Sequence, residues 1–439
     1  MSEKQGIWSR ASALAAATPE SRNRYVDFLR ALSICAVVIG HWLMAAPYVA
    51  DGELILTGNM LQSHPWTQWL SWLFQVMPVF FMVGGYSNGI SWRSAQRDGR
   101  SYGAWLNGRL QRLVGPILPL LAIWVLLAIV GGQLGVDAYM LKLGSQMALI
   151  PVWFLAVYIG VVVLVPLTYA AWQRFGLSSF WILLVAVVLD DILFLTGTRA
   201  VGWLNYALIW LAVHQLGYAW LEGRLGSSRW SLVWGGCALM VLMGLVRFGP
   251  YPLSMVSVPG DDISNSLPPK LPMLLLGIAQ CGLLLALERP ARRWLSRLKV
   301  WTAAVLVNGM IMTVFLWHLT ASTLVIVIAL SVVGDLGLAY EPGSGAWWLL
   351  RPVWLSIYAV ALMGFVVVFL RFERGASSYP VPAWRQVAGA VLVCGGLSLL
   401  ALMGIGGEGR ITASIGIVLL PFAGAALAGV NPLRSNKVG

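Results

Sequence analysis

The sequence predicts an all-α polytopic membrane protein with about twelve transmembrane helices. Of its 439 residues, 59% are hydrophobic and only 10% are charged, whereas a soluble domain carries about 25% charged residues. Apolar runs of roughly twenty residues recur along the chain, and a run of that length crosses a bilayer as a helix. Positive charge also alternates between successive loops, as the orientation rule for membrane proteins requires.

Twelve apolar segments define the expected helices. In chain order they are 25–47, 67–91, 113–131, 151–171, 179–196, 201–220, 230–249, 271–288, 301–331, 347–370, 386–404 and 411–430. A backbone in hydrocarbon must satisfy its own hydrogen bonds, and uniformly apolar runs of this length do so as helices rather than as barrel strands. The expected organisation is a cytosolic tail (1–24), a ten-helix core (25–370), two additional helices (371–430) and a second cytosolic tail (431–439).

The loops test this helix count. Of the 29 lysines and arginines, 22 fall on the side proposed to be cytosolic and Arg30 lies within the first helix. The six on the outer side are Lys142, Arg199, Arg247, Lys270, Arg351 and Arg410. Both termini are therefore expected in the cytosol. The net charge of +12 is spread between apolar runs instead of forming a stripe, so we expect a lipid bilayer and no nucleic acid as partner.

Several functions are not indicated by the sequence. The four cysteines lie in apolar runs without paired spacing, so neither disulfides nor zinc are expected. The alanine-rich patch Ala11–Ala17 is too short for a signal peptide. Segment 250–270 is rich in Pro, Ser and Asp and predicts an irregular surface loop. Abundant Ala, Gly, Arg and Trp suggest a GC-rich bacterial genome, and hence a location in the bacterial cytoplasmic membrane.

The first helix carries three ionisable residues, Asp27, Arg30 and His41. Ionisable side chains inside a membrane are costly and are candidates for a functional site. Asp27 and Arg30 are three residues apart and can pair on one helical face. Arg30 is expected near the cytoplasmic mouth and His41 about 16 Å deeper on the same face. This arrangement suits a substrate with an anionic head and a reactive tail; the alternative is that His41 only hydrogen-bonds a neighbouring helix.

Short motifs occur in a fixed order along the chain. Asp27 and Arg30 form Asp-x-x-Arg, and ten residues separate Arg30 from His41. The later motifs are Met77-Pro78-Val79-Phe80-Phe81 with Gly84-Gly85-Tyr86, Arg109-x-x-Arg112, Trp153-Phe154-Leu155 and Phe315-Leu316-Trp317-His318. This set resembles the acyltransferase 3 family of membrane O-acyltransferases over about residues 24–370. Gly84 stands where that family usually has serine, so a role for that hydroxyl does not carry over.

The resemblance implies transfer of an acyl group, commonly acetyl, from cytosolic acyl-CoA to a hydroxyl of an envelope glycan or glycolipid. Acyl-CoA would be a co-substrate, with no tightly bound cofactor. Expected donor-binding residues are Arg30, Arg109, Arg112 and Trp153. His41 would act as general base or as transient acyl carrier, Asp27 would pair with Arg30, and His318 would orient the thioester or supply an oxyanion contact. The alternative for Arg109 and Arg112 is that they only help to set the orientation of the chain in the membrane. The alternative for His318 is a purely structural role.

Other polar residues receive weaker interpretations. Gly85-Tyr86-Ser87-Asn88-Gly89 spells G-x-S-x-G, but a nucleophile elbow needs a strand-to-helix turn, and this segment is expected inside a helix. Asp190 and Asp191 either accept a proton or contact the acceptor sugar, or they only cap a helix end in water. His64 and His214 have no partner at metal-ligand spacing, so no metal is assigned.

The competing functional class is a transporter or flippase of a lipid or sugar, for which many helices and buried charges would also serve. It would move its substrate without covalent change, and it leaves the ordered motifs unexplained. The acceptor, the acyl length, the role of the last two helices and the oligomeric state do not follow from the sequence.

Overall fold

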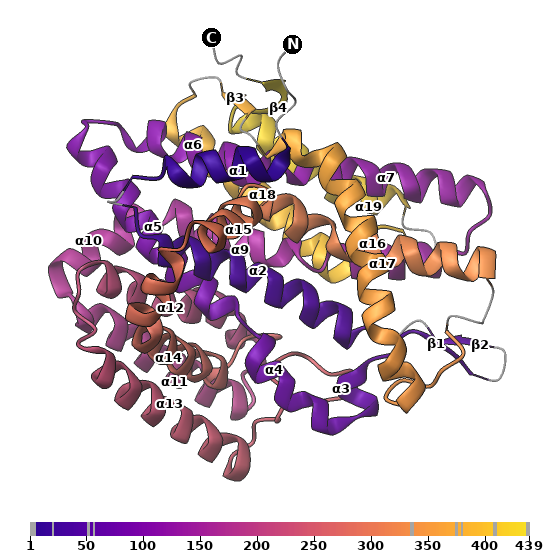
Figure 1. The fold of residues 1–439 in the computed structure, drawn as a ribbon, viewed down its shortest axis with the longest axis horizontal. Helices are drawn as coiled ribbons and strands as arrows, with labels where there is room; N and C mark the ends of the chain where they lie inside the picture. The colour runs from indigo at the N-terminus through magenta and orange to yellow at the C-terminus, as the bar shows by residue number, and fades with distance from the viewer. Residues whose placement is uncertain are drawn as a thin grey trace. The chain divides into compact units, whose positions relative to one another are not determined.

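Helices, most of them apolar, make up most of the described chain (Figure 1). This computed structural model describes residues 6–19, 22–50, 53–55, 58–333, 338–373, 376–378, 381–406 and 411–435. Within these ranges, nine helices are long and apolar enough to cross a membrane. A tenth crossing results if α8 (Ala138–Leu149) and α9 (Val152–Val163), which meet at 44°, form one bent span. The chain is an all-α polytopic membrane protein, as predicted.

The chain divides into two compact units, the first built from Met1–Ala46, Thr57–Ser91 and Leu167–Ile311. Its elements are α1 (Ile7–Ala16), α2 (Arg24–Met44), α3 (Met60–Ser63), η1 (Pro65–Thr67), α4 (Gln68–Phe74), most of α5 (Met77–Arg97), most of α10 (Val165–Phe175), α11 (Leu177–Leu195), η2 (Arg199–Leu204), α12 (Asn205–Leu221), α13 (Ser228–Phe248), α14 (Leu271–Leu295) and α15 (Leu298–Asn308).

Glycines let helices of the first unit approach closely. Where α13 packs on α14, a Cβ atom on Gly282 would lie 2.6 Å from the carbonyl oxygen of Ser231. Where α5 packs on α12, a Cβ atom on Gly85 would overlap the carbonyl oxygen of His214. Small residues at such crossings allow the backbone contact that drives helix association in membranes.

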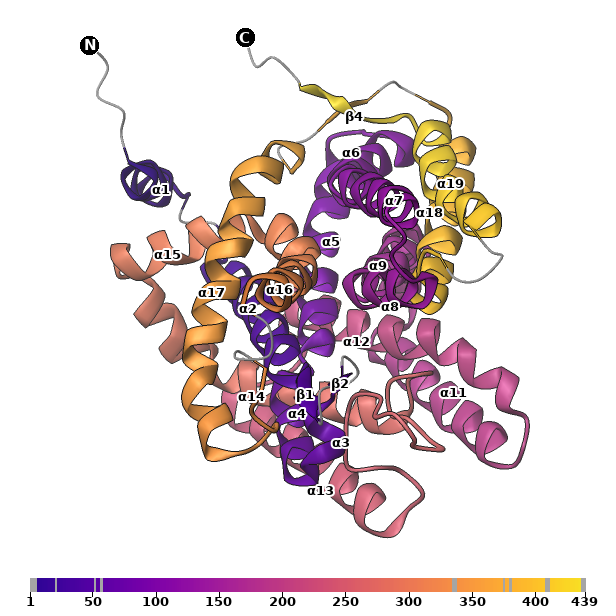
Figure 2. The same cartoon turned by 90° about the vertical axis from the view of Figure 1, so that its right-hand side faces the viewer.

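The second unit contains Pro47–Leu56, Trp92–Pro166 and Met312–Gly439. Besides α8 and α9, its elements are the hairpin of β1 (Tyr48–Ala50) and β2 (Glu53–Ile55), α6 (Tyr102–Val114), α7 (Ile117–Gln133), α16 (Ile311–Val333), α17 (Gly345–Phe369), η4 (Leu370–Phe372), α18 (Ala383–Met403), α19 (Ile411–Leu427), and the antiparallel pair of β3 (Ala376–Ser378) and β4 (Val430–Ser435). Figure 2 shows α18 and α19 side by side, and α18 also packs against α6, α8 and α9.

Three expected helices are each broken, and the one expected at 151–171 is split at Leu164 between α9 and α10. The segment expected at 301–331 is split between α15 and α16, because the Asn308 side chain turns back to donate to the carbonyl oxygen of Ala304 at 2.8 Å. The new start of α16 is capped by Glu373, whose carboxylate accepts from the backbone N–H groups of Met312 and Thr313, each at 3.1 Å. The segment expected at 67–91 is split at Gln75, and Pro78 falls in the first turn of α5, where its missing N–H is not needed.

Other differences concern polar segments. Residues 138–149, left outside the expected crossings, form α8, capped by the Asp137 carboxylate. Segment 250–270 is irregular as predicted but is tightly held, since Ser254, Asn265 and Lys270 have no exposed surface. Of the positive residues used to orient the chain, Lys4, Arg374, Arg410 and Lys437 lie outside the described residues.

Candidate functional site

The α2 helix carries Asp27, Arg30 and His41 on one uninterrupted segment. It begins after Asn23, whose side chain accepts a hydrogen bond from the backbone N–H of Tyr25 at 3.1 Å, an N-cap that satisfies a helix-end donor. The Tyr25 hydroxyl donates to the carbonyl oxygen of Leu284 at 2.6 Å and ties this end to α14. The expected rise of about 16 Å between Arg30 and His41 therefore applies.

Asp27 is the centre of an ion cluster. It is only 6% exposed, and its carboxylate lies 2.6 Å from Nε of Arg22 and 3.5 Å from Nη1 of Arg30. The predicted pairing of Asp27 with Arg30 is thus confirmed, and Arg22 is an additional partner. The hydrogen bond to Asp27 raises the pKa of Arg22, as does the negative charge of that carboxylate, while burial opposes the change. Two guanidinium groups against one carboxylate leave the cluster with a net positive charge.

The cluster joins three helices. Arg30 donates through Nη2 to Oγ of Ser87 on α5 at 3.0 Å. Asn308, the last residue of α15, donates to the backbone carbonyl of Asp27 at 2.9 Å. Ser87 lies inside helix α5, so its G-x-S-x-G context forms no nucleophile elbow.

Sequence reasoning missed Arg22, Ser87 and Asn308. Ser87 stands 57 residues from Arg30 and Asn308 stands 281 residues from Asp27, and no pattern in one sequence links residues so far apart. Arg22 precedes the first residue of α2, so helical spacing does not predict its contact with Asp27.

His41 lies in the last turn of α2 and is half-buried. The neighbouring Gly40 lets α2 pass close to α4, because a Cβ atom there would lie 3.0 Å from Cβ of Phe74. The helix ends at Met44, three residues after His41. An imidazole ring can take up or release a proton, so His41 places a group capable of acid–base chemistry in the last turn of α2.

The second unit brings two distant motifs together. Phe154 and Phe315 pack edge to face with ring centroids 5.4 Å apart, although they come from the Trp-Phe-Leu and Phe-Leu-Trp-His motifs. The ring centroids of Trp153 and Phe154 are 6.3 Å apart, and those of Phe315 and His318 are 6.2 Å apart. Trp153 and His318 are therefore parts of one aromatic cluster spanning α9 and α16.

His318 is completely buried. Its Nδ1 lies 2.7 Å from the carbonyl oxygen of Phe315. Because a carbonyl can only accept, Nδ1 carries a proton, and in the neutral ring Nε2 is then the acceptor nitrogen. The arrangement fixes both the tautomer and the ring orientation.

Arg109 and Arg112 lie on α6, which packs against α9. The Arg109 guanidinium is 5.6 Å from the centre of the Trp105 ring, and Arg112 is exposed. The predicted site residues therefore divide between the units: Asp27, Arg30 and His41 belong to the first, and Arg109, Arg112, Trp153 and His318 to the second.

Asp190 and Asp191 are 5% and 1% exposed, so the interpretation that they cap a helix end in water is wrong. Asp191 accepts hydrogen bonds from Asn205 at 2.9 Å, from the Tyr251 hydroxyl at 2.9 Å and from the backbone N–H of Leu271 at 2.7 Å. This carboxylate fixes the start of α14 and one end of segment 250–270. These three hydrogen bonds give Asp191 a structural role.

His214 is also fully buried, and its Nε2 lies 3.2 Å from Nδ2 of Asn88. This contact joins α12 to α5 beside the Gly85 crossing. His64 lies at the end of α3, with Nδ1 3.2 Å from the hydroxyl of Ser63.

No curated protein and no solved structure matched the chain. A family model described as an acyltransferase domain matches residues 23–371, which include both units' predicted site residues and end before α18. The matched region covers about four-fifths of the sequence. The chain therefore belongs to the acyltransferase 3 family.

Proposed function

We propose that the protein transfers an acyl group, in the first instance acetyl, from cytosolic acyl-CoA to a hydroxyl of an envelope glycan or glycolipid. The observation that carries this proposal is the α2 helix, with two arginines around the buried Asp27 at its start and His41 in its last turn. Membership of the acyltransferase 3 family supports the reaction class and disfavours the transporter alternative.

The donor site would be cationic. Arg22 and Arg30 outnumber Asp27 in the first cluster, and the guanidinium groups of Arg109 and Arg112 add positive charge in the second unit. Guanidinium groups bind phosphate oxygens with paired, charge-assisted hydrogen bonds. Arg30 in the first unit and Arg109 and Arg112 in the second are the proposed candidates for binding the phosphates of acyl-CoA, and Trp153 is the candidate aromatic contact of the donor.

The chemistry would centre on His41. As general base it would take the proton of the acceptor hydroxyl while that oxygen forms a bond to the thioester carbonyl carbon. The carbon–sulfur bond then breaks, and the CoA thiolate leaves with a proton returned by His41. As acyl carrier, a ring nitrogen of His41 would first attack the thioester carbonyl carbon and break the carbon–sulfur bond, which releases the CoA thiolate. The acceptor hydroxyl would then take the acyl group and free the ring, and its proton would end on the CoA thiol. The buried His318, held by Phe315, would supply an oxyanion contact only if its ring rotated or were doubly protonated. Otherwise it would orient the thioester by packing alone, because its Nε2 is an acceptor and a thioester has no donor.

The finer topology also belongs to the proposal. Adding α12 and α19, each 17 residues long, to the ten crossings gives the twelve predicted from the sequence. Seventeen residues is at the lower limit of about 17–25 for a spanning helix. With twelve crossings and the distribution of positive charge, both termini lie in the cytosol of a bacterial cell and the acceptor is modified on the outer side.

The test uses the purified protein in liposomes with acetyl-labelled CoA and a bacterial glycolipid extract. Label should appear on an extract component with the parent protein, and His41→Ala should reduce the rate by at least about 100-fold, within the range that one acid–base group contributes. His64→Ala is the matched control and should retain the parent rate, since His64 lies outside the site.

Unchanged transfer by a folded His41→Ala variant would refute the role of His41. Label that stays on the parent protein when the extract is omitted, and is absent from His41→Ala, would identify the acyl-carrier route over the general-base route. Movement of unmodified glycolipid across the membrane without acyl-CoA would instead support transport.

A further inference from the structure

The junction between α14 and α15, residues 289–299, is strongly basic. Within eleven residues it carries five positively charged side chains, which are Arg289, Arg292, Arg293, Arg297 and Lys299. All five are exposed. Arg292 pairs with Glu288 at 2.7 Å, and within the described ranges of the chain the other four form no ion pair. The junction therefore presents positive charge that the surrounding protein does not neutralise.

Helix stability does not account for all of this charge. Arg289, Arg292 and Arg293 lie in the last two turns of α14, where cations are favourable to the helix dipole. Arg297 and Lys299 instead flank the first residue of α15, where positive charge opposes the dipole. The orientation rule for membrane proteins places cations beside membrane helices but requires no particular neighbours for them. The side chains that stand between the cations are therefore informative.

These neighbours are apolar and uncovered. Trp294 is 45% exposed and Leu298 is 49% exposed. Trp294 also packs edge to face on Phe28 of α2, with ring centroids 5.5 Å apart, so its indole ring is held in place while part of it stays open. Indole rings lie at the headgroup level of bilayers, and arginine side chains extend from there to the phosphates. The junction has the composition of a helix end at that level.

The N-terminal helix α1 lies beside α15 (Figure 2). Two small residues, Ala11 and Ala15, form its buried line, and Ala15 packs in a cluster with Trp301 and Ala304 of α15. Just after α1, the Thr18 hydroxyl accepts a hydrogen bond from Nε1 of Trp301 at 2.9 Å. Because Trp301 follows the basic junction directly, these contacts fix the end of α1 beside it.

Large apolar side chains flank the buried line of α1. At about 100° per residue, Ile7 and Leu14 lie on one side of that line and Trp8 lies on the other. They are 75%, 66% and 50% exposed, respectively. The opposite face carries the small residues Ser9 and Ala13. A surface helix with an apolar face of this kind is typical of the bilayer interface, where lipid covers the side chains that protein leaves open.

We propose that α1 and the α14–α15 junction form a binding surface for an anionic phospholipid, such as phosphatidylglycerol. The negative headgroup lies against Arg292, Arg293 and Arg297, and the apolar edges of α1 enter the bilayer beside it. A zwitterionic phospholipid fits less well, because its ammonium group is repelled by the cations. A soluble phosphate compound such as CoA would leave the apolar edges of α1 in water.

The surface adjoins the start of α2. Arg24 donates to the carbonyl oxygen of Leu295 at 3.4 Å, and its guanidinium group is 5.3 Å from the centre of the Trp301 ring. Arg22, between α1 and α2, bonds to Asp27. A lipid bound here therefore contacts the elements that hold the Asp27 ion cluster. The inference does not depend on the acyl-transfer reaction, because lipid binding is measured without acyl-CoA.

Native mass spectrometry of the full-length protein in a neutral detergent tests the surface by counting retained phospholipids. At equal acyl chains, the parent should bind phosphatidylglycerol at least about tenfold more tightly than phosphatidylcholine. The triple variant Arg292→Gln, Arg293→Gln and Arg297→Gln should lose at least about tenfold in affinity for phosphatidylglycerol, since one cation near an anionic lipid surface contributes about fivefold. Melting temperatures confirm that the variant is folded, as expected for exposed residues.

The matched control removes the same charge elsewhere. Arg93→Gln, Arg97→Gln and Arg100→Gln change three exposed arginines at the end of α5 and just after it. This variant should keep its affinity for phosphatidylglycerol within about twofold of the parent, because attraction between exposed charges falls off within a Debye length.

A second pair of variants tests the part played by α1. Ile7→Ser with Leu14→Ser keeps every charge but removes one apolar edge, and affinity for phosphatidylglycerol should fall at least about fivefold, since covering a large apolar side chain is worth that much or more. Ala13→Ser, on the opposite face, is the control and should bind as the parent does.

Three results would overturn the proposal. Equal retention of the two phospholipids by the parent would remove the anionic preference. Equal losses in the junction variant and in the Arg93, Arg97 and Arg100 control would reduce the effect to general charge attraction. Displacement of phosphatidylglycerol by CoA, with CoA binding lost in the junction variant, would assign the surface to a soluble ligand instead of a lipid.

Discussion

At the level of single residues, the most informative contact is the hydrogen bond from Arg30 to Ser87. This contact joins α5 to the ion cluster at the start of α2. We infer that the Ser87 hydroxyl holds the Arg30 guanidinium group in position.

Ser87→Ala tests this inference. The change removes an acceptor for a charged donor, a contact worth about 1.5–3 kcal/mol, so kcat/KM for acyl-CoA should fall by about tenfold or more. Steady-state kinetics with Ser91→Ala as control would check it, because the Ser91 hydroxyl, on the same helix, donates to the backbone carbonyl of Asn88 at 3.3 Å. Equal kinetics for both variants would contradict the role of Ser87.

Asp27→Asn makes a complementary test at the same cluster. Replacing the buried carboxylate leaves Arg22 and Arg30 without a neutralising charge. Because their side chains are 56% and 30% exposed, the loss is smaller than for a fully buried pair. The melting temperature of the purified protein should fall by several degrees, with loss of transfer. Asp98→Asn, in an exposed pair with Arg97 and Arg100, should have little effect, since exposed pairs contribute about 0–1 kcal/mol. A stable, active Asp27→Asn protein would show that the cluster is dispensable.

At the level of elements, Asp191 connects three segments. It lies on α11 and binds the start of α12 through Asn205, the start of α14 through Leu271 and the irregular segment through Tyr251. Burial raises the pKa of Tyr251, and the nearby Asp191 charge adds to this increase. The phenol therefore stays protonated and remains a hydrogen-bond donor.

Asp191→Asn should release this connection. Asparagine keeps the shape but replaces one acceptor oxygen with an NH2 group that faces other donors, a loss of about 1–3 kcal/mol per unsatisfied group. We expect a lower melting temperature and faster cleavage of segment 250–270 in limited proteolysis. Asp261→Asn is the control because Asp261 is exposed in the same segment; equal cleavage rates for the two variants would argue against the anchoring role.

At the level of the whole molecule, the described chain extends beyond the matched family region. The match ends at residue 371, yet α18 packs against α6, α8 and α9 in the second unit, and the Cys394 thiol contacts the backbone of Ala156 at 3.1 Å. The added helices therefore support α9, the helix that carries Trp153. Their contact with each other depends on glycine, because a Cβ atom on Gly389 would overlap the carbonyl oxygen of Gly424.

Gly389→Ala should separate α18 from α19 and lower the melting temperature. Gly395→Ala on the same helix is the control: no atom lies within 4 Å of its added Cβ, and alanine favours a helix by about 1 kcal/mol over glycine. Comparing the two by thermal unfolding in detergent isolates the contact from the helix preference. Equal melting temperatures would show that the two helices pack without this close approach.

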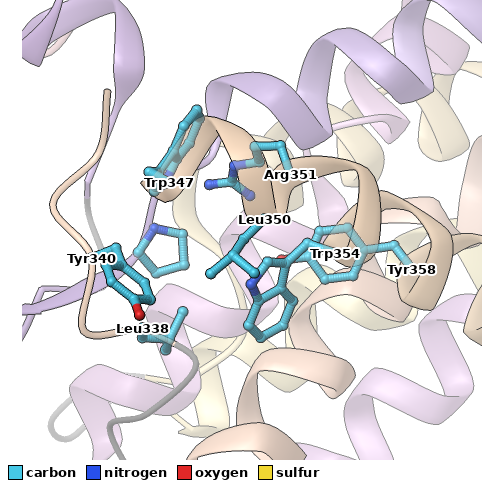
Figure 3. A pocket seen from close by; sticks show the side chains of 8 residues that line it. Leu338, Tyr340, Trp347, Leu350, Arg351, Trp354 and Tyr358 are labelled. Atoms are coloured by element: carbon cyan, nitrogen blue, oxygen red, sulfur yellow. The ribbon is translucent and has the colours of Figure 1, made fainter. Parts of the chain in front are cut away.

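The sequence predicted the membrane class and the pairing of Asp27 with Arg30 because both depend on local patterns, hydropathy and helical spacing. The breaks at Gln75 and Asn308 were not predicted from hydropathy, although Pro78 and the Asn308-Gly309 pair are local signals for a helix start and a helix end. Likewise, the sequence predicted Arg351 among the outer-loop residues, whereas the structure buries it on α17, with its guanidinium group 3.7 Å from the centre of the Trp347 ring (Figure 3).

The cap of α16 has a consequence for biosynthesis. Glu373 lies 61 residues after Met312 and beyond the whole of α17. A ribosome makes α16 first, so the N–H groups at its start must be satisfied by water or by the insertion machinery until α17 has emerged and η4 has been made. The helix bearing His318 reaches its final state only when the next helix is complete, and a nascent chain that stalls between the two would present an unfinished helix end to the cell's quality control.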